Sequence, residues 1–170
     1  DKYVDKFIVC EANFTHSGEK KEINFNIKDY PDFKNKIIHL ILKDDPCKEV
    51  EDRVILNNRD KSILRIEKQR NYIKSALGDF SGEDYIIHSD NDEIPNLNLV
   101  NFKQNKKKIL VFEQNLYYYK FNLCYPNFYW YGSKACKLKD LKSLDWLRMV
   151  KNKKYNFLRL DTLFSEKKYI

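Results

Sequence analysis

Three short apolar runs, two of them followed by acidic residues, constrain the fold of this chain more than any other feature. The runs cover residues 7–10, 37–42 and 85–88, and Glu11 and Asp90 come just after the first and the last of them. Continuous short apolar runs are typical of strands buried on both faces of a parallel sheet. In open sheets of this kind, ligands bind beyond the carboxyl ends of the strands. We therefore expect Glu11 and Asp90 to lie in one cleft at that edge.

Helical and extended patterns alternate along the rest of the chain. Apolar residues recur at helical spacing from Ile63 to Leu77, and Gly78 is a typical helix stop. The other expected elements are a loop over 13–21, an irregular stretch over 44–58, a short helix or turn over 95–102, extended segments over 109–112, 116–121 and 128–131, and an amphipathic helix over 138–150. The order predicts one α/β domain over residues 1–170, with an open, mostly parallel sheet and flanking helices.

The composition excludes several classes of protein. The chain has 170 residues, of which 42% are hydrophobic and 15% aromatic, so it has the apolar surface that a disordered chain lacks. No apolar stretch approaches the roughly 20 residues of a membrane span, so we expect no transmembrane segment in this chain. The four cysteines lie far apart without a Cys-x-x-Cys pair, which argues against a zinc ribbon and predicts free thiols in a reducing compartment.

Positive charge exceeds negative charge, with 32 basic and 25 acidic residues and a formal net charge of +7. This balance is compatible with nucleic acid and with a small anionic substrate. The lysines are spread through the chain, and an acidic cluster follows the third apolar run. We therefore expect no nucleic-acid partner and keep a Lys-rich nucleic-acid-binding protein only as a less favoured alternative.

The most informative segment is the acidic cluster of Asp90, Asp92 and Glu93. Three carboxylates within four residues repel one another, and a bound divalent cation would relieve that repulsion. Oxygen ligands favour a hard ion such as Mg²⁺ or Mn²⁺. The alternative is a helix N-terminus, with Asp90 as the cap and the other acids in the first turn.

Several segments together resemble glycosyltransferase family 17, the family of β-1,4-mannosyl-glycoprotein N-acetylglucosaminyltransferases and their bacterial and viral relatives. The closest agreement lies in residues 4–18, which include Cys-Glu-Ala-Asn-Phe-Thr-His-Ser-Gly, and in residues 84–95, which include Ser-Asp-Asn-Asp-Glu-Ile-Pro. Residues 67–71, Glu-Lys-Gln-Arg-Asn, also agree, and residues 117–122 and 130–132 agree more loosely.

This resemblance implies a GT-A type fold and a UDP-N-acetylglucosamine donor. By the same resemblance, Glu11 would contact the uridine and Arg70 would lie near the nucleotide or diphosphate. Asp92 would be the metal ligand of the Asp-x-Asp pair, with Asp90 beside it and nearer the ribose or sugar. Trp130 would offer an aromatic face to a sugar. Two plainer interpretations stay open: Arg70 pairs with Glu67 one turn away, and Trp130 packs in the core or in a sheet.

The implied reaction is transfer of the sugar, with inversion, to a hydroxyl of a glycan acceptor. It needs a carboxylate that takes the proton of the acceptor hydroxyl. Glu113, at the end of an apolar run, is the candidate for this catalytic base; Asp145 and Asp161 are poorer ones. A non-catalytic protein that binds sugar nucleotides or glycans is the alternative function.

The two ends of the sequence depart from the family pattern. An earlier strand and helix with an Asn-Glu motif, and a later Gly-Trp-His-Phe-like motif, are absent from the 170 residues. We therefore expect a domain that is truncated at both ends. The expected location is the cytoplasm, as for a bacterial or viral enzyme, or the Golgi membrane for a eukaryotic relative without its anchor.

Overall fold

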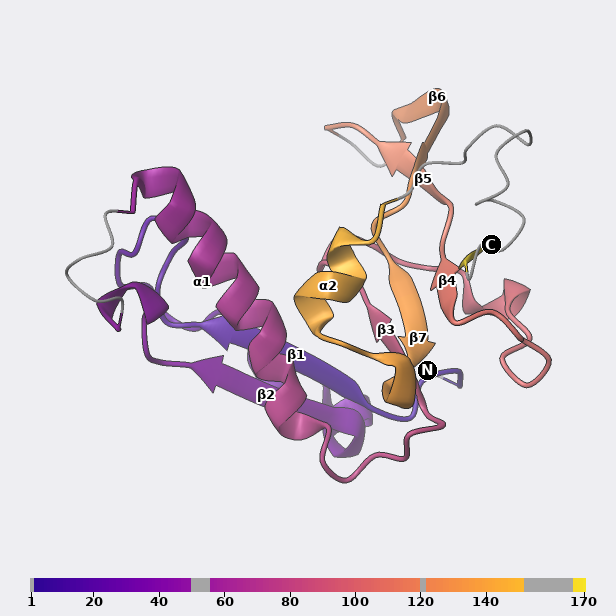
Figure 1. Cartoon of the computed structure of the whole chain (residues 1–170), viewed down its shortest axis with the longest axis horizontal. Coiled ribbons are helices and arrows are strands. Elements are labelled where there is room, and N and C mark those ends of the chain that lie inside the picture. The colour runs from indigo at the N-terminus through magenta and orange to yellow at the C-terminus, as the bar shows by residue number, and fades with distance from the viewer. Residues whose placement is uncertain (1, 50–55, 120–121, 152–166) are drawn as a thin grey trace. The chain divides into compact units, whose positions relative to one another are not determined.

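The computed structural model describes residues 2–49, 56–119, 122–151 and 167–170 (Figure 1). They belong to two compact units, Asp1–Asp79 and Phe80–Ile170. Among the described residues, no helix is long and apolar enough to cross a membrane.

The first unit contains a parallel pair of strands covered by one helix (Figure 1). Strands β1 (Phe7–Ala12) and β2 (Ile37–Leu42) run parallel, with Phe7 opposite Ile37 and Ala12 opposite Leu42. Helix α1 (Asn58–Tyr72) begins after Asn57, whose side chain accepts the N–H of Asp60 at 2.9 Å, and continues into the 3-10 turn Ile73–Ala76. Gly78 follows this turn, so the expected helix and its stop are confirmed.

The crossover from β1 to β2 carries two 3-10 helices, Ile27–Asp29 and Pro31–Lys36. Helix α1 is joined to β1 by two hydrogen bonds: Gln69 Nε2 donates to the carbonyl of Cys10 at 3.0 Å, and Cys10 Sγ donates to the carbonyl of Gln69 at 3.3 Å. The apolar core of this unit consists of Ala12, Phe14 and Leu42, with Tyr72 of α1 packed against them.

A buried ion pair joins α1 to the loops that follow β1 and β2. Arg65 donates from Nε to Asp45 Oδ1 at 3.0 Å and from Nη2 to Oδ2 at 2.9 Å, and its Nη1 donates to the carbonyl of His16 at 3.0 Å. Gly18 has φ +94°, and a β-carbon there would stand 2.4 Å from the Arg65 guanidinium. Only glycine therefore combines this backbone conformation with room for Arg65.

The second unit is built on a four-stranded mixed sheet in the order β3-β7-β4-β8. Strand β7 (Lys134–Lys137) lies between β3 (Tyr85–His88) and β4 (Ile109–Val111) and is antiparallel to both. Strand β8 (Lys167–Tyr169) pairs in parallel with β4. The short helix α2 (Leu144–Met149) also belongs to this unit, and the Oγ of Ser143 caps it by accepting the N–H of Trp146 at 2.9 Å.

Both faces of β4 are buried, so its side chains enter two separate cores. Ile109 and Val111 pack with Cys136 and with Leu147 of α2. Leu110 points to the opposite face and packs with Phe112 and Ala135, against partly buried residues that include Tyr85 and Ile170. Continuous burial of this kind explains why the strand is apolar throughout.

A two-stranded antiparallel hairpin follows β4 (Figure 1). It consists of β5 (Gln114–Tyr117) and β6 (Cys124–Trp130), with an irregularity in register between Asn115 and Tyr117. Tyr119 and Asn127 have left-handed backbone conformations, with φ of 59° and 61°. Every residue of β6 is exposed.

The mixed α/β class is confirmed, but the described strands do not form the expected single, mostly parallel sheet. They form three sheets, in which the pairs β3–β7, β4–β7 and β5–β6 are antiparallel. The difference arises from β7, which the sequence analysis did not predict because Lys134 and Lys137 interrupt its apolar character. The expected helix over 138–150 is also shorter, since a 3-10 turn (Leu138–Asp140) is separated from α2.

Candidate functional site

The acidic residues after β3 form a tight turn rather than a helix start. The N–H of Glu93 donates to the carbonyl of Asp90 at 3.1 Å, and the N–H of Asp90 donates to Glu93 Oε2 at 3.0 Å. The next helical element is the 3-10 turn Leu97–Leu99. The helix-cap interpretation is therefore wrong, because no helix begins at Asp90.

Glu93 is a buried anchor that joins this turn to β6, to the residue preceding β7 and to α2. Its Oε1 accepts the indole N–H of Trp130 at 2.6 Å, and both of its oxygens accept from Arg148 Nη1 at 2.8 and 2.9 Å. Ser133 Oγ donates to Oε2 at 3.4 Å. Burial by itself would raise the pKa of Glu93, but the hydrogen bonds from Trp130, the Asp90 N–H and Arg148 outweigh it and hold the pKa below its usual value. Glu93 is thus a charged structural partner rather than a free metal ligand.

Asp90 and Asp92 differ from Glu93 and from each other in their surroundings. Asp90 Oδ2 accepts from Arg148 Nη2 at 2.5 Å, while the Asp90 side chain keeps 41% of its surface exposed. Asp92 is exposed, and its side chain makes no hydrogen bond or ion pair with any residue that the structure describes. Arg148 therefore relieves part of the repulsion in the acidic cluster, and Asp92 is the carboxylate most available to a ligand. No local signal identifies Arg148, which lies 58 positions after Asp90.

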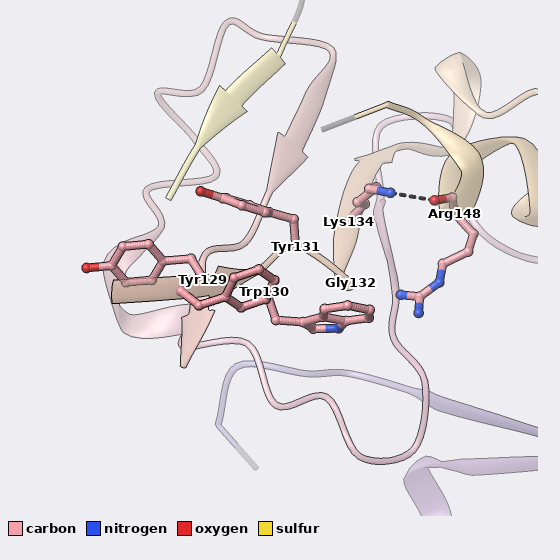
Figure 2. Close-up of a pocket in the computed structure, with 7 residues that line it drawn as sticks. Tyr129, Trp130, Tyr131, Gly132, Lys134 and Arg148 are labelled. Carbon is pink, nitrogen blue, oxygen red and sulfur yellow. Dashed lines mark hydrogen bonds between the residues drawn. The ribbon is translucent and has the colours of Figure 1, made fainter. Parts of the chain in front are cut away.

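A cavity of about 250 Å³ is lined in part by Arg148, the partner of Asp90 and Glu93. It is lined by Phe128, Tyr129, Trp130, Tyr131, Gly132, Lys134 and Arg148. The indole of Trp130 points to the side of Gly132 and Arg148, and the ring of Tyr129 extends away from it (Figure 2). Trp130 is 41% exposed and therefore is not a core residue, but it does lie in the two-stranded β5–β6 sheet. Tyr131, by contrast, packs against the core of β4.

Glu11, the first predicted binding residue, holds the loop that follows β1. Its Oε1 accepts from Lys21 Nζ at 2.6 Å, and its two oxygens also accept from the N–H groups of Asn24 and Phe25. Desolvation raises the pKa of Glu11, but these hydrogen bonds and the charge of Lys21 outweigh it and bring the pKa from 4.5 to about 2.

The remaining predicted residues occupy different places in the two units. Arg70 lies half-buried in the last turn of α1. Glu113 lies half-buried between β4 and β5, and its N–H donates to the carbonyl of Ile170 at 2.6 Å. Asp145 is in the first turn of α2, and Asp161 is outside the described residues. Because Glu11 and Arg70 belong to the first unit and Asp90 to the second, their common cleft stays a prediction.

The first unit also contains a cavity of about 420 Å³ beside the start of α1. Its lining includes Arg59, Lys61 and Arg65. The buried Arg65 is already neutralised by Asp45, so attraction for an anion would come from the two less buried cations. The cavity lined by Trp130 and Arg148, where aromatic and charged groups meet, is therefore the better candidate site.

Within the described residues, no three His, Cys, Asp or Glu side chains are grouped so that the protein alone could enclose a metal ion. A protein-family model described as Glycosyltransferase family 17 matches residues 1–145. No match was found among the curated proteins or the solved structures. The matched range contains the acidic turn, the cavity-lining residues of β6 and the loop held by Glu11, while Arg148 lies just beyond it.

Proposed function

The chain belongs to glycosyltransferase family 17 and is a glycosyltransferase, and from this we propose that it transfers N-acetylglucosamine from UDP-N-acetylglucosamine to a hydroxyl of a glycan acceptor, with inversion. The family membership carries the proposal. The exposed Asp92 beside the half-exposed Asp90 supports it, because a free carboxylate next to a positioned one suits a sugar-nucleotide diphosphate that binds with a divalent cation.

The oxygen donors of the acidic turn fit a hard cation, Mn²⁺ or Mg²⁺. Asp92 would hold it, together with the Asp90 oxygen that does not accept from Arg148. Two protein carboxylates suffice in principle, since Mg²⁺ is commonly bound through one or two carboxylates plus substrate phosphates and water. Such a cation would offset the negative charge of the departing diphosphate.

The chain's own residues have four proposed tasks. Arg148 holds Asp90 and Glu93 in place, so that Asp92 faces the donor. Trp130 presents its ring to a sugar. Glu11 contacts the uridine from the loop that it holds, and Arg70 lies near the nucleotide or diphosphate.

In the proposed reaction, the acceptor oxygen forms a bond to the anomeric carbon while the bond from that carbon to the diphosphate oxygen breaks. Glu113 takes the proton of the acceptor hydroxyl, and the diphosphate leaves with the electron pair of the broken bond. A single displacement of this kind inverts the anomeric configuration and forms no covalent enzyme intermediate. We place the enzyme in the cytoplasm, as for a bacterial or viral relative; the four free thiols support a reducing compartment.

Calorimetric titration of UDP-N-acetylglucosamine, with and without Mn²⁺, tests this function. The wild type should bind the donor more tightly with Mn²⁺. Asp92→Ala should lose most of that dependence, and Asp92→Asn, which keeps the shape without the charge, should lose it as well. Asp79→Asn removes another exposed carboxylate and should leave the Mn²⁺ dependence of donor binding unchanged. Equal donor affinity in the wild type and the Asp92 variants under both conditions would contradict the proposal.

Turnover separates a transferase from a protein that only binds sugar nucleotides. With an accepted glycan, the wild type should release UDP, and Glu113→Gln should lower kcat by about 10²- to 10⁴-fold while donor affinity is retained. Donor binding without any release of UDP, with every glycan offered, would favour a non-catalytic role.

A further inference from the structure

The two strands of the β5–β6 hairpin are uncharged and rich in aromatic residues, in a chain of which 34% of the residues are charged. Neither strand contains an Asp, Glu, Lys or Arg. Large rings on both strands keep about half of their surface exposed: Tyr117 47%, Tyr125 56%, Phe128 45%, Tyr129 52% and Trp130 41%. Exposed rings gathered in this way mark an interaction site more often than exposed apolar side chains that are scattered singly.

Three of these rings, Tyr125, Phe128 and Trp130, share one face of the hairpin and form what we call the aromatic row. Phe128 and Trp130 are two positions apart on β6, and side chains at that spacing point to the same face. Tyr125 joins them because Asn127 is left-handed, with φ 61°, and shifts the alternation by one position. The rings of Tyr125 and Phe128 are accordingly in edge-to-face contact, with centroids 5.8 Å apart. The two-residue step from Phe128 to Trp130 adds about 7 Å to that separation, so the row extends for about 12 Å.

The aromatic row ends at the proposed reaction site. Trp130, its last ring, is fixed by the hydrogen bond from its indole N–H to Glu93 in the acidic turn. Phe128 and Trp130 both line the cavity that also contains Arg148, the partner of Asp90. A ligand that lies along the row would therefore reach the acidic turn with one of its ends.

The chemistry of this surface suits a neutral sugar chain. The C–H faces of pyranose rings are apolar and pack against aromatic rings, while their hydroxyls need hydrogen-bonding groups at the edges. The hairpin supplies amide side chains for that purpose, with Gln114 directly opposite Trp130 and Asn127 between the rings of the row. The two strands carry no Lys or Arg, which favours an uncharged ligand along the row over an anionic lipid surface or a nucleic acid, both of which are bound through lysine and arginine.

We propose that the aromatic row binds the acceptor as an extended, uncharged oligosaccharide, with the sugar that receives the transferred residue at Trp130 and further sugars along Phe128 and Tyr125. This rests on the proposed function, because it makes the hairpin the acceptor side of the same site. A row of about 12 Å with three rings holds more than one sugar in succession. The enzyme therefore selects the length of its acceptor as well as the sugar at its end.

Binding of sugars of increasing length to the 170-residue chain tests this inference. The probes are β-1,4-linked N-acetylglucosamine oligomers and mannose oligomers, each of one to six units, titrated without donor. For at least one series, affinity should rise with length and then level off. Tyr125→Ala should weaken binding of the longest oligomers by about 3- to 10-fold, as expected for loss of one stacked ring, and leave that of the monomer unchanged.

Tyr117→Ala is the matched control, because Tyr117 is an exposed tyrosine of the same hairpin paired opposite Cys124, on the face away from Tyr125. It should bind every oligomer like the wild type. The inference is overturned if neither series binds, if affinity is independent of length, or if Tyr117→Ala is as damaging as Tyr125→Ala. It is also overturned if the only effect of Tyr125→Ala is to convert a dimer to a monomer, as measured by sedimentation, or to weaken binding of the protein to anionic vesicles. Because donor binding and its dependence on Asp92 are measured separately, failure here leaves the proposed transferase function intact.

Discussion

The Cα of Gly132 lies directly against the carboxylate of Glu93: a β-carbon at Gly132 would stand 1.6 Å from Glu93 Oε1. The same β-carbon would stand 2.3 Å from the indole nitrogen of Trp130. Contacts this short cannot be met by a small adjustment, so the hydrogen bond between Glu93 and Trp130 requires a glycine at this position.

Gly132→Ala should therefore push Glu93 and Trp130 apart and destabilise the protein by about 1–3 kcal/mol, as overpacking commonly does. Gly78→Ala is the matched control, because a β-carbon at Gly78 has no atom within 4 Å. The free energy of unfolding in urea measures both changes. Equal stability of the two variants would show that Gly132 is not a packing requirement.

Arg148→Met should destabilise the protein by about 3 kcal/mol, because it leaves the buried Glu93 carboxylate without its charge partner. The surface ion pair between Lys139 and Glu83 offers a comparison, since both of its side chains are more than half exposed. Lys139→Met should change the free energy of unfolding by less than about 1 kcal/mol. If Arg148→Met lowers the free energy of unfolding by no more than Lys139→Met does, the buried Glu93 carboxylate does not depend on Arg148.

The free energy of unfolding should depend on pH through Glu11, whose carboxylate holds the loop that follows β1. The pKa of Glu11 is about 2 in the folded chain against 4.5 as the ordinary value, so folding favours the ionised form. The ionised Glu11 therefore contributes up to about 3 kcal/mol to the free energy of unfolding. This contribution is fully present above pH 4.5 and is lost as the pH falls towards about 2. Glu11→Gln should lower the free energy of unfolding at pH 7 and converge with the wild type near pH 2.

Glu22→Gln, at an exposed position near the same loop, should follow the wild type across this range. Urea unfolding at several pH values measures all three proteins. If Glu11→Gln and the wild type differ in free energy of unfolding by the same amount at pH 7 and at pH 2, the loop does not depend on the charge of Glu11.

The four cysteines are free thiols, as expected, and should differ strongly in reactivity. Burial raises the pKa of Cys10 to about 11, and burial together with the nearby Asp140 raises that of Cys136 to about 12, whereas Cys124 is exposed. Since the thiolate is the reactive form, iodoacetamide at pH 8 should label Cys124 first in the folded chain and all four in denaturant. Mass spectrometry of the labelled peptides identifies the sites; labelling of Cys136 at the rate of Cys124 would contradict the packing of β7.

Local patterns were sufficient for the elements whose sequence is uniform. Strands β2 and β3 coincide with the runs at 37–42 and 85–88, because each run is apolar apart from one histidine and is bounded by polar residues. Strand β7 was missed because it contains two lysines. Lys134 is nevertheless 2% exposed, and its ammonium group donates to the carbonyl of Arg148, a partner that only the folded chain supplies.

The candidate site was predictable only in part for the same reason. The segment at 89–93 was identified from its carboxylates, but these carboxylates have unequal roles that depend on distant residues. Glu93 points inward to Trp130 and Arg148, 37 and 55 positions away, while Asp92 stays exposed. Adjacent acidic residues look alike in the sequence, and only their hydrogen-bond partners in the folded chain distinguish the buried Glu93 from the exposed Asp92.

The left-handed backbone at Asn127 determines which rings of the hairpin stand together. Residues with φ near 61° are mainly glycine, asparagine and aspartate, whereas Tyr125 and Phe128 need only be flat and apolar. Under the proposed acceptor role, Phe, Tyr and Trp are interchangeable at these two positions and adjust the fit to different sugars, while Trp130 must keep the N–H that it donates to Glu93. Asn127 has less freedom, because few residue types favour this conformation, although Tyr119 also adopts it with φ 59°. Divergence of acceptor preference among relatives should therefore run through Tyr125 and Phe128 and change Asn127 more rarely.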